Sequence, residues 1–192
     1  MAIVKDMQDI LNRYEEGFNA AWDEYKKANE LYKQERMTGR MLDEKREKRN
    51  ETLAQLTRAA SDEITAAHKK YADTLPGRYE KNPDQLDTNA LAMLTSAASG
   101  VIELTGTDLE NLFNRFDGNL TMQAAISDFA NKHETGARIT FFSEKQRSED
   151  AENYASACRR CLSTSPDNPN LPGTFAYYCE GTRAVPASLQ GE

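Results

Sequence analysis

Two apolar stripes at helical spacing run through residues 3–75, and they restrict the fold more than any other feature of the chain. Their members are separated alternately by three and four residues, which places each stripe along one face of an α-helix. The first stripe consists of Ile3, Met7, Ile10, Tyr14, Phe18, Ala21, Tyr25, Ala28 and Tyr32, and the second of Leu53, Leu56, Ala60, Ile64, Ala67, Tyr71 and Leu75. Charged and amide residues fill most of the second stripe's gaps. Two such stripes predict helix-on-helix packing.

The connection between the stripes can be made in two ways. Gly39 lies midway and suits the end of a helix, because glycine adopts the left-handed conformation without a side-chain penalty. The two arms, residues 3–36 and 41–75, would then form an antiparallel hairpin about 50 Å long at 1.5 Å per residue. The alternative is one continuous helix that dimerises in parallel. We favour the hairpin because residues 43–52 offer no apolar side chain for a coiled-coil seam. Pro76 is predicted to end the second arm.

A small helical domain is predicted over residues 82–162. Its helix starts are expected at four residues whose side chains can cap a helix: Asn82, Thr107, Thr121 and Ser143. The first three helices should end at Gly100, Gly118 and Gly136, and the fourth near Leu162. Residues 138–142 are β-branched and aromatic but have no evident partner strand, so we interpret them as an extended connector.

The remaining residues, 163–192, hold four of the six prolines and show no periodicity. Phe175, Tyr177 and Tyr178 are too apolar for a fully solvated segment, so this tail is expected to dock on its own domain or on a neighbour. The sequence therefore predicts an all-α protein with a hairpin at 1–77, a small helical domain at 82–162 and an irregular tail at 163–192.

The net charge of −7 argues against a general nucleic-acid binder, since the acidic excess lies entirely after residue 81. The strongest basic cluster consists of Arg40, Lys45, Arg46, Lys48 and Arg49, and acids are interleaved with it. We interpret the cluster as a solvated helix face with ion pairs, with phosphate contact as the alternative. The sequence shows neither a membrane span nor a signal-peptide pattern.

Few residues suggest catalysis or metal binding. Cys158 and Cys161 form a C-x-x-C pair and Cys179 is a third thiol, but a structural zinc site needs four ligands. His68 and His133 both have ordinary structural explanations on helices. We therefore expect no metal site, no cofactor and no catalytic residue, and a protein that is not an enzyme.

Residues Leu112–Met122, followed by Ala125–Ala130, carry a short helix, a cap and a second helix. This pattern resembles small helical proteins encoded near the head genes of tailed bacteriophages of Gram-positive hosts, in which a long charged helical region precedes short helices. The resemblance covers roughly a third of the chain. It implies a phage origin, a structural or assembly role, and a location in the host cytoplasm or the virion.

The leading hypothesis is a non-enzymatic phage structural or assembly protein that binds itself and other phage proteins. Val4, Leu11, Trp22 and Leu31 lie off the first stripe, and their joint exposure would favour a homo-oligomer. The alternative is a phage-encoded inhibitor of a host defence protein, with the acidic second half mimicking nucleic acid. A metal-dependent enzyme that uses the cysteines is a third hypothesis.

Overall fold

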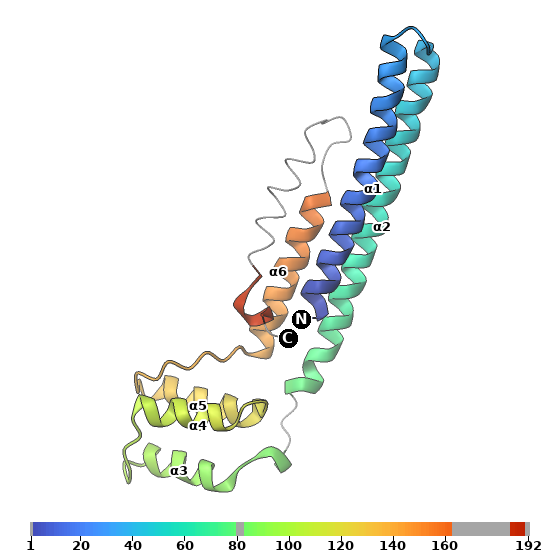
Figure 1. Ribbon diagram of the computed structural model, residues 1–192. Helices are drawn as coiled ribbons and strands as arrows, with labels where there is room; N and C mark the ends of the chain where they lie inside the picture. The colour runs from blue at the N-terminus through green and yellow to red at the C-terminus, as the bar shows by residue number, and fades with distance from the viewer. Residues whose placement is uncertain (1, 80–82, 163–184, 191–192) are drawn as a thin grey trace. The chain divides into compact units, whose positions relative to one another are not determined.

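The computed structural model describes residues 2–79, 83–162 and 185–190, which are mostly helical and contain no strand. The α-helices are α1 (Ala2–Lys33), α2 (Gly39–Tyr79), α3 (Thr88–Ala98), α4 (Gly106–Arg115), α5 (Leu120–Lys132) and α6 (Glu144–Leu162) (Figure 1). Two short 3₁₀ helices, η1 (Pro83–Gln85) and η2 (Ala187–Leu189), complete the described elements. The predicted all-α class is confirmed.

The chain divides into two compact units that differ from the predicted ranges 1–77, 82–162 and 163–192. The first unit combines residues 1–72 with residues 148–192, and the second consists of residues 73–147. The boundaries fall inside α2 and inside α6, so most of α6 groups with the hairpin rather than with the short helices. Of the predicted tail, residues 163–184, with Phe175, Tyr177, Tyr178 and Cys179, lie outside the described residues, as do residues 191–192.

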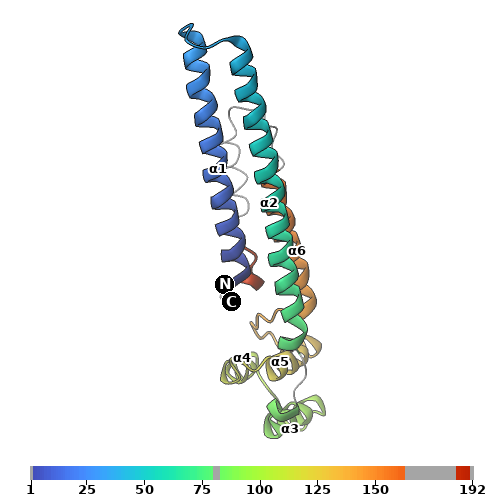
Figure 2. The same cartoon turned by 90° about the vertical axis from the view of Figure 1, so that its right-hand side faces the viewer.

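The predicted hairpin is present in the first unit, where α1 and α2 run antiparallel beside each other (Figures 1 and 2). Residues early on α1 pair with residues late on α2: Arg13 forms an ion pair with Glu63, and the hydroxyls of Tyr14 and Thr57 lie 3.3 Å apart. Glu24, further along α1, pairs with Lys45 near the start of α2. This reversed order excludes a continuous helix through Gly39.

The two predicted stripes form the buried seam of this hairpin. Its buried members are Ile3, Met7, Ile10, Tyr14, Phe18, Ala21 and Ala28 on α1, and Leu53, Ala60, Ile64 and Tyr71 on α2. Tyr25, Leu56 and Ala67 are half-buried, and Leu75 is buried as well. Tyr32, the last member of the first stripe, is exposed.

The expected exposed patch on the first arm is wrong for three of its four residues. Val4, Leu11 and Trp22 are buried, and only Leu31 is exposed. The expectation assumed a two-helix hairpin, in which each helix buries one face. In the structure α6 lies beside the hairpin as a third helix of the same unit (Figures 1 and 2). Its own buried face consists of Ala151, Tyr154, Ala155, Cys158, Cys161 and Leu162.

Glu35, not Gly39, is the left-handed residue that ends the first helix. The amide of Arg36 donates to the carbonyl of Leu31 at 2.9 Å and the amide of Glu35 to that of Tyr32 at 3.0 Å, which is the Schellman arrangement. Glu35 has φ 56°, a conformation that usually selects glycine. Gly39 instead begins α2, so the left-handed residue lies four residues before the predicted one.

We expect Glu35→Gly to raise the free energy of unfolding by about 1 kcal/mol, because it removes the left-handed strain of a residue with a Cβ. The matched control is Lys27→Gly at an exposed position inside α1, which should lower stability by about 1 kcal/mol. Urea unfolding of the three proteins measures both changes. A loss of stability in both variants would contradict the turn described here.

Pro76 does not end the second helix, since α2 continues through it to Tyr79. A proline within a helix cannot donate the hydrogen bond that an amide would make here to the carbonyl of Ala72, and its ring crowds that carbonyl. The boundary between the two compact units follows Ala72 directly. The proline therefore marks a change of unit rather than the end of the helix.

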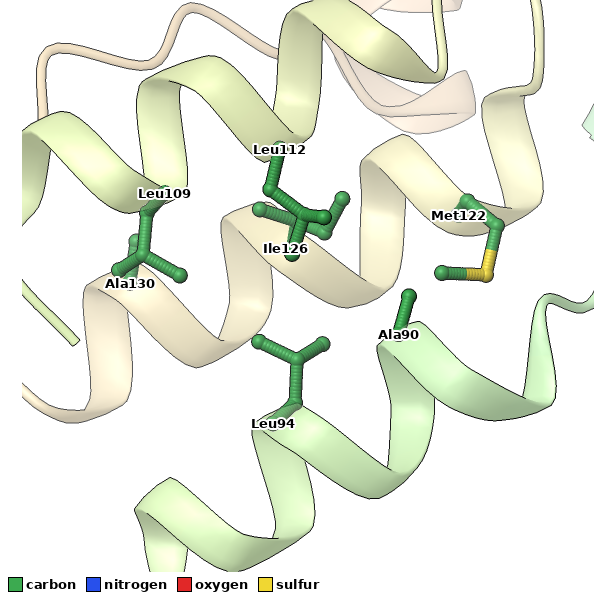
Figure 3. Close-up of a cluster of buried hydrophobic side chains, with 7 residues drawn as sticks. All are labelled: Ala90, Leu94, Leu109, Leu112, Met122, Ile126 and Ala130. Atoms are coloured by element: carbon green, nitrogen blue, oxygen red, sulfur yellow. The ribbon is translucent and has the colours of Figure 1, made fainter. Parts of the chain in front are cut away.

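The second unit is built from α3, α4 and α5 around a small apolar core. Figure 3 shows side chains from all three helices pointing toward one another. The core consists of Ala90 and Leu94 on α3, Leu109 and Leu112 on α4, and Met122, Ile126 and Ala130 on α5. Residues 138–142 form no strand, as expected, and Ile139 packs against this core.

The capping residues of these short helices differ from the predicted ones by a few positions. Asp87 caps α3 in place of Asn82, which lies outside the described residues, and Asn119 caps α5 in place of Thr121. Thr105 caps α4 in place of Thr107, with Asp108 completing the capping box. Ser143 accepts from the Gln146 amide at 3.2 Å, so the predicted start of α6 is correct.

Gly106, in the first turn of α4, is required by a close approach that the sequence did not reveal. A Cβ at this position would lie 2.9 Å from the amide nitrogen of Ala137 and 3.0 Å from the carbonyl oxygen of Thr135. Both atoms belong to the backbone and cannot rotate away, so only glycine fits here.

Candidate functional site

The tip of the hairpin is the candidate functional site, because it exposes apolar side chains that nothing in the described chain covers. We define the tip as residues 31–41. Leu31 is 36%, Tyr32 45% and Met41 50% exposed. They are three of the six large apolar residues that are exposed in the described part of the chain. Single exposed apolar residues are ordinary, but three at the same end of the hairpin make this end the candidate contact surface.

The helices hold these side chains in defined positions. Leu31 and Tyr32 lie in the last turn of α1, and the Schellman hydrogen bonds fix the backbone there. Thr38 precedes α2, and its hydroxyl accepts from the Met41 amide at 3.4 Å. A Cβ built on Gly39 would lie 3.9 Å from the Tyr32 ring, which therefore rests against the start of α2.

The charged residues near the tip mostly neutralise one another. Lys33 pairs with Glu30 at 2.8 Å, Arg40 with Glu44 at 3.3 Å, and Arg46 with Asp43 at 3.0 Å. Each pair joins neighbours on the same helix. A surface with an apolar centre and a locally balanced charged rim is typical of protein–protein contacts rather than of nucleic-acid binding.

A second exposed apolar pair lies in the second unit, on the loop between α3 and α4. Val101 is 75% exposed and Ile102 39%. This loop borders an open depression of about 850 Å³ that is also lined by Phe129 and His133. The mixed polar and apolar lining does not indicate one class of ligand.

The predicted basic cluster divides between two environments. Arg40 and Arg46 pair along their own helix, as the predicted solvated face requires. Lys45 and Lys48 both reach Glu24 on α1, at 3.0 and 3.5 Å. Arg49 is only 5% exposed, so the prediction of a solvated residue is wrong there.

Trp22 and Tyr25 hold the Arg49 side chain rather than an external ligand. The guanidinium carbon lies 4.2 Å from the Trp22 ring centroid and 4.5 Å from that of Tyr25. Its Nε and Nη2 donate to the Asn50 side chain at 3.1 and 2.7 Å. A delocalised cation packed against two nearly perpendicular rings replaces the apolar contact that residues 43–52 lack.

Cys158 and Cys161 lie on the buried face of α6, where two small side chains fit against neighbouring helices. Cys179 falls outside the described residues. Within the described ranges no three His, Cys, Asp or Glu side chains lie close enough together to hold a metal ion. The expectation of no metal site therefore stays a prediction for the whole chain.

We expect purified protein to contain less than about 0.2 zinc per chain and to melt at the same temperature with and without a chelator, since a structural zinc supplies much of the folding energy of its domain. Elemental analysis and circular dichroism measure both quantities. Stoichiometric zinc that is lost together with helicity would contradict the prediction.

His68 takes part in a polar cluster between α2 and α6, within the first unit. Its Nε2 lies 3.3 Å from Glu152 Oε2, while Glu152 Oε1 accepts from Arg159 Nη2 at 2.7 Å and from the Ser156 hydroxyl at 3.0 Å. Burial raises the pKa of Glu152, but the Ser156 hydrogen bond and the charges of His68 and Arg159 outweigh it and lower the pKa below its ordinary value.

This lowered pKa means that ionised Glu152 stabilises the fold at neutral pH, and that the contribution is lost as the pH falls through the folded-state pKa. We expect Glu152→Gln to be less stable than wild type at about pH 7 and the difference to shrink at about pH 3. Urea unfolding at both values measures it. A difference that is constant with pH would contradict the ionic role of Glu152.

His133 lies in the second unit, where it caps the C-terminal end of α5. Its ring stacks on Phe129 with a centroid distance of 4.4 Å. This is the structural position expected from the sequence, at the end of its helix.

No described helix is long and apolar enough to cross a membrane. No family model, curated protein or solved structure matches the chain.

Proposed function

We propose that the protein is a non-enzymatic bacteriophage assembly or structural protein that acts through protein–protein contacts and associates with itself through the hairpin tip. The exposure of Leu31, Tyr32 and Met41 carries this proposal. The phage origin rests on the resemblance of residues 112–130 to helical proteins encoded near phage head genes.

The geometry of the first unit supports a contact made by the tip. In both views the hairpin extends past the end of α6 at Leu162 (Figures 1 and 2). Its apolar end therefore stands clear of the unit's third helix, where a second molecule can reach it. Tyr and Met are enriched at interface centres, and Met in particular adapts to partner surfaces.

Self-association is the simplest use of such a tip. Most soluble oligomers of one chain are symmetric dimers in which the same patch meets itself. Two tips with balanced charge can approach without long-range repulsion, since Lys33, Arg40 and Arg46 are already paired within each chain. The apolar side chains would then be covered by their counterparts.

Charge substitutions at the tip test the proposal. The double variant Leu31→Lys and Met41→Lys should be monomeric by sedimentation at concentrations where wild type is oligomeric, because two charges would have to be buried at each contact. The control carries the same added charge at exposed positions of α2, as Gln55→Lys and Ala66→Lys, and should assemble normally. Wild-type protein that is monomeric, or a tip variant that assembles equally well, would overturn self-association through the tip.

The position of the gene tests the assembly role separately. Assembly proteins are expected beside capsid and portal genes, so such neighbours support the role and an isolated location away from all phage genes contradicts it. Self-association and assembly role can therefore fail independently.

A further inference from the structure

A cavity of about 190 Å³ lies between α1 and α2 at the level of Arg49. On the α1 side it is lined by Gly17, Ala20 and Ala21, which are small enough to leave the space open. On the α2 side its lining is cationic, formed by Lys45, Lys48 and Arg49. The seam is apolar elsewhere, so this stretch departs from the pattern of the rest of the hairpin.

The three cations lie on one face of α2, because positions i, i+3 and i+4 are neighbours on a helix. Glu24 is the only acid among the residues that line the cavity, and its carboxylate is shared by Lys45 and Lys48. The hydrogen bond from Lys45 and the charge of Lys48 hold the pKa of Glu24 below its ordinary value. The lining thus contains one carboxylate and three cations, two of which are paired with that carboxylate.

Arg49 is held in place before any ligand arrives. The rings of Trp22 and Tyr25 both pack against its guanidinium, and Asn50 accepts from its edge. A guanidinium fixed in this way loses little conformational freedom when an anion approaches. The lysines, which are 39% and 64% exposed at their side chains, can turn toward the same point from the rim.

We propose that this cavity binds a small oxyanion, a single phosphate or carboxylate group. Its volume is below the range of about 300–1,000 Å³ that is typical of pockets for nucleotide- or drug-sized molecules. Charge-assisted hydrogen bonds from lysine and arginine are the strong contacts for such a group. The proposal concerns the side of the hairpin at Arg49 and does not depend on self-association at the tip.

Trp22 provides the readout, since it is the only tryptophan in the chain and lies against Arg49. Inorganic phosphate, acetate and chloride are titrated separately at constant ionic strength. We expect a saturable change in Trp22 emission and a rise in melting temperature with phosphate, acetate or both, and neither with chloride. Which of the two anions saturates identifies whether the group is a phosphate or a carboxylate.

Two variants locate the binding. Lys45→Gln with Lys48→Gln should weaken the affinity at least about tenfold, whereas the control Arg40→Gln with Arg46→Gln, outside the cavity, should leave it unchanged. Ala20→Leu fills the cavity from an exposed position without changing any charge and should block binding, and Ala66→Leu is its control. A response that does not saturate, that chloride reproduces, or that survives both cavity variants would overturn the proposal.

Discussion

Replacing Ile64 with Asp should lower the free energy of unfolding by about 3 kcal/mol or more. Ile64 is fully buried in the hairpin seam, and a carboxylate there would have to lose its hydration or take up a proton at a cost. Urea unfolding followed by circular dichroism measures the change through the transition midpoint and its slope.

Ala66→Asp is the matched control, because it places the same side chain two residues later on the exposed face of α2. Its cost should stay below about 1 kcal/mol, which is the helix propensity difference between the two residues. Equal losses in the two variants would show that the buried and exposed faces of α2 are assigned incorrectly.

Truncating Ile126 to Ala should destabilise the second unit by about 2–5 kcal/mol, which combines the lost burial with the cavity left behind. Ile126 is fully buried between Leu109 and Met122 in the three-helix core (Figure 3). Such a loss is large for a unit whose core is formed by seven small and medium-sized side chains.

The hydrogen-exchange rates of the α5 amides measure the stability of the second unit directly. This holds whether or not the first unit unfolds together with the second. The control is Asp128→Ala on the exposed face of the same helix, which should change stability by less than about 0.5 kcal/mol. Faster exchange in α5 of both variants to the same extent would contradict the assigned core.

The hairpin could be predicted from the sequence because its signal repeats over many turns. Each of the two stripes contains enough members at helical spacing to define a buried face, and an error at one residue, such as Tyr32, does not alter the result. The position of the turn, in contrast, depends on one or two residues. A single glycine is a weak signal, and hydrogen bonds to Leu31 and Tyr32 can hold Glu35 in the left-handed conformation instead.

The partnership of α6 with the hairpin could not be predicted from local patterns. The spacing of apolar residues indicates that a helix has a buried face, but it does not indicate which other helix covers that face. The positions of Val4, Leu11 and Trp22 outside the first stripe were the available signal, since these apolar residues widen the apolar face of α1 beyond one stripe. A helix with so wide an apolar face needs a second neighbour.

The candidate site was predicted in part. Leu31 was expected to be exposed and is, whereas Tyr32 was assigned to the seam and Met41 received no role. The exposure of these side chains depends on where the turn between α1 and α2 begins. If the turn moves by a few residues, different side chains face the other helix of the hairpin. Likewise, the buried Arg49 could have been anticipated from the lack of apolar residues at 43–52 together with Trp22 and Tyr25 on the facing helix.

The central claim is that the hairpin tip is a contact surface between copies of the chain, and hydrogen exchange at two concentrations tests it most directly. The two samples should differ by about a hundredfold in protein concentration, so that mass action shifts any self-association. We predict slower amide exchange for residues 31–41 in the concentrated sample. The amide exchange of residues in the middle of α2, far from the tip, should be the same in both samples. Identical exchange at the tip in both samples, with wild type monomeric throughout, would contradict the account.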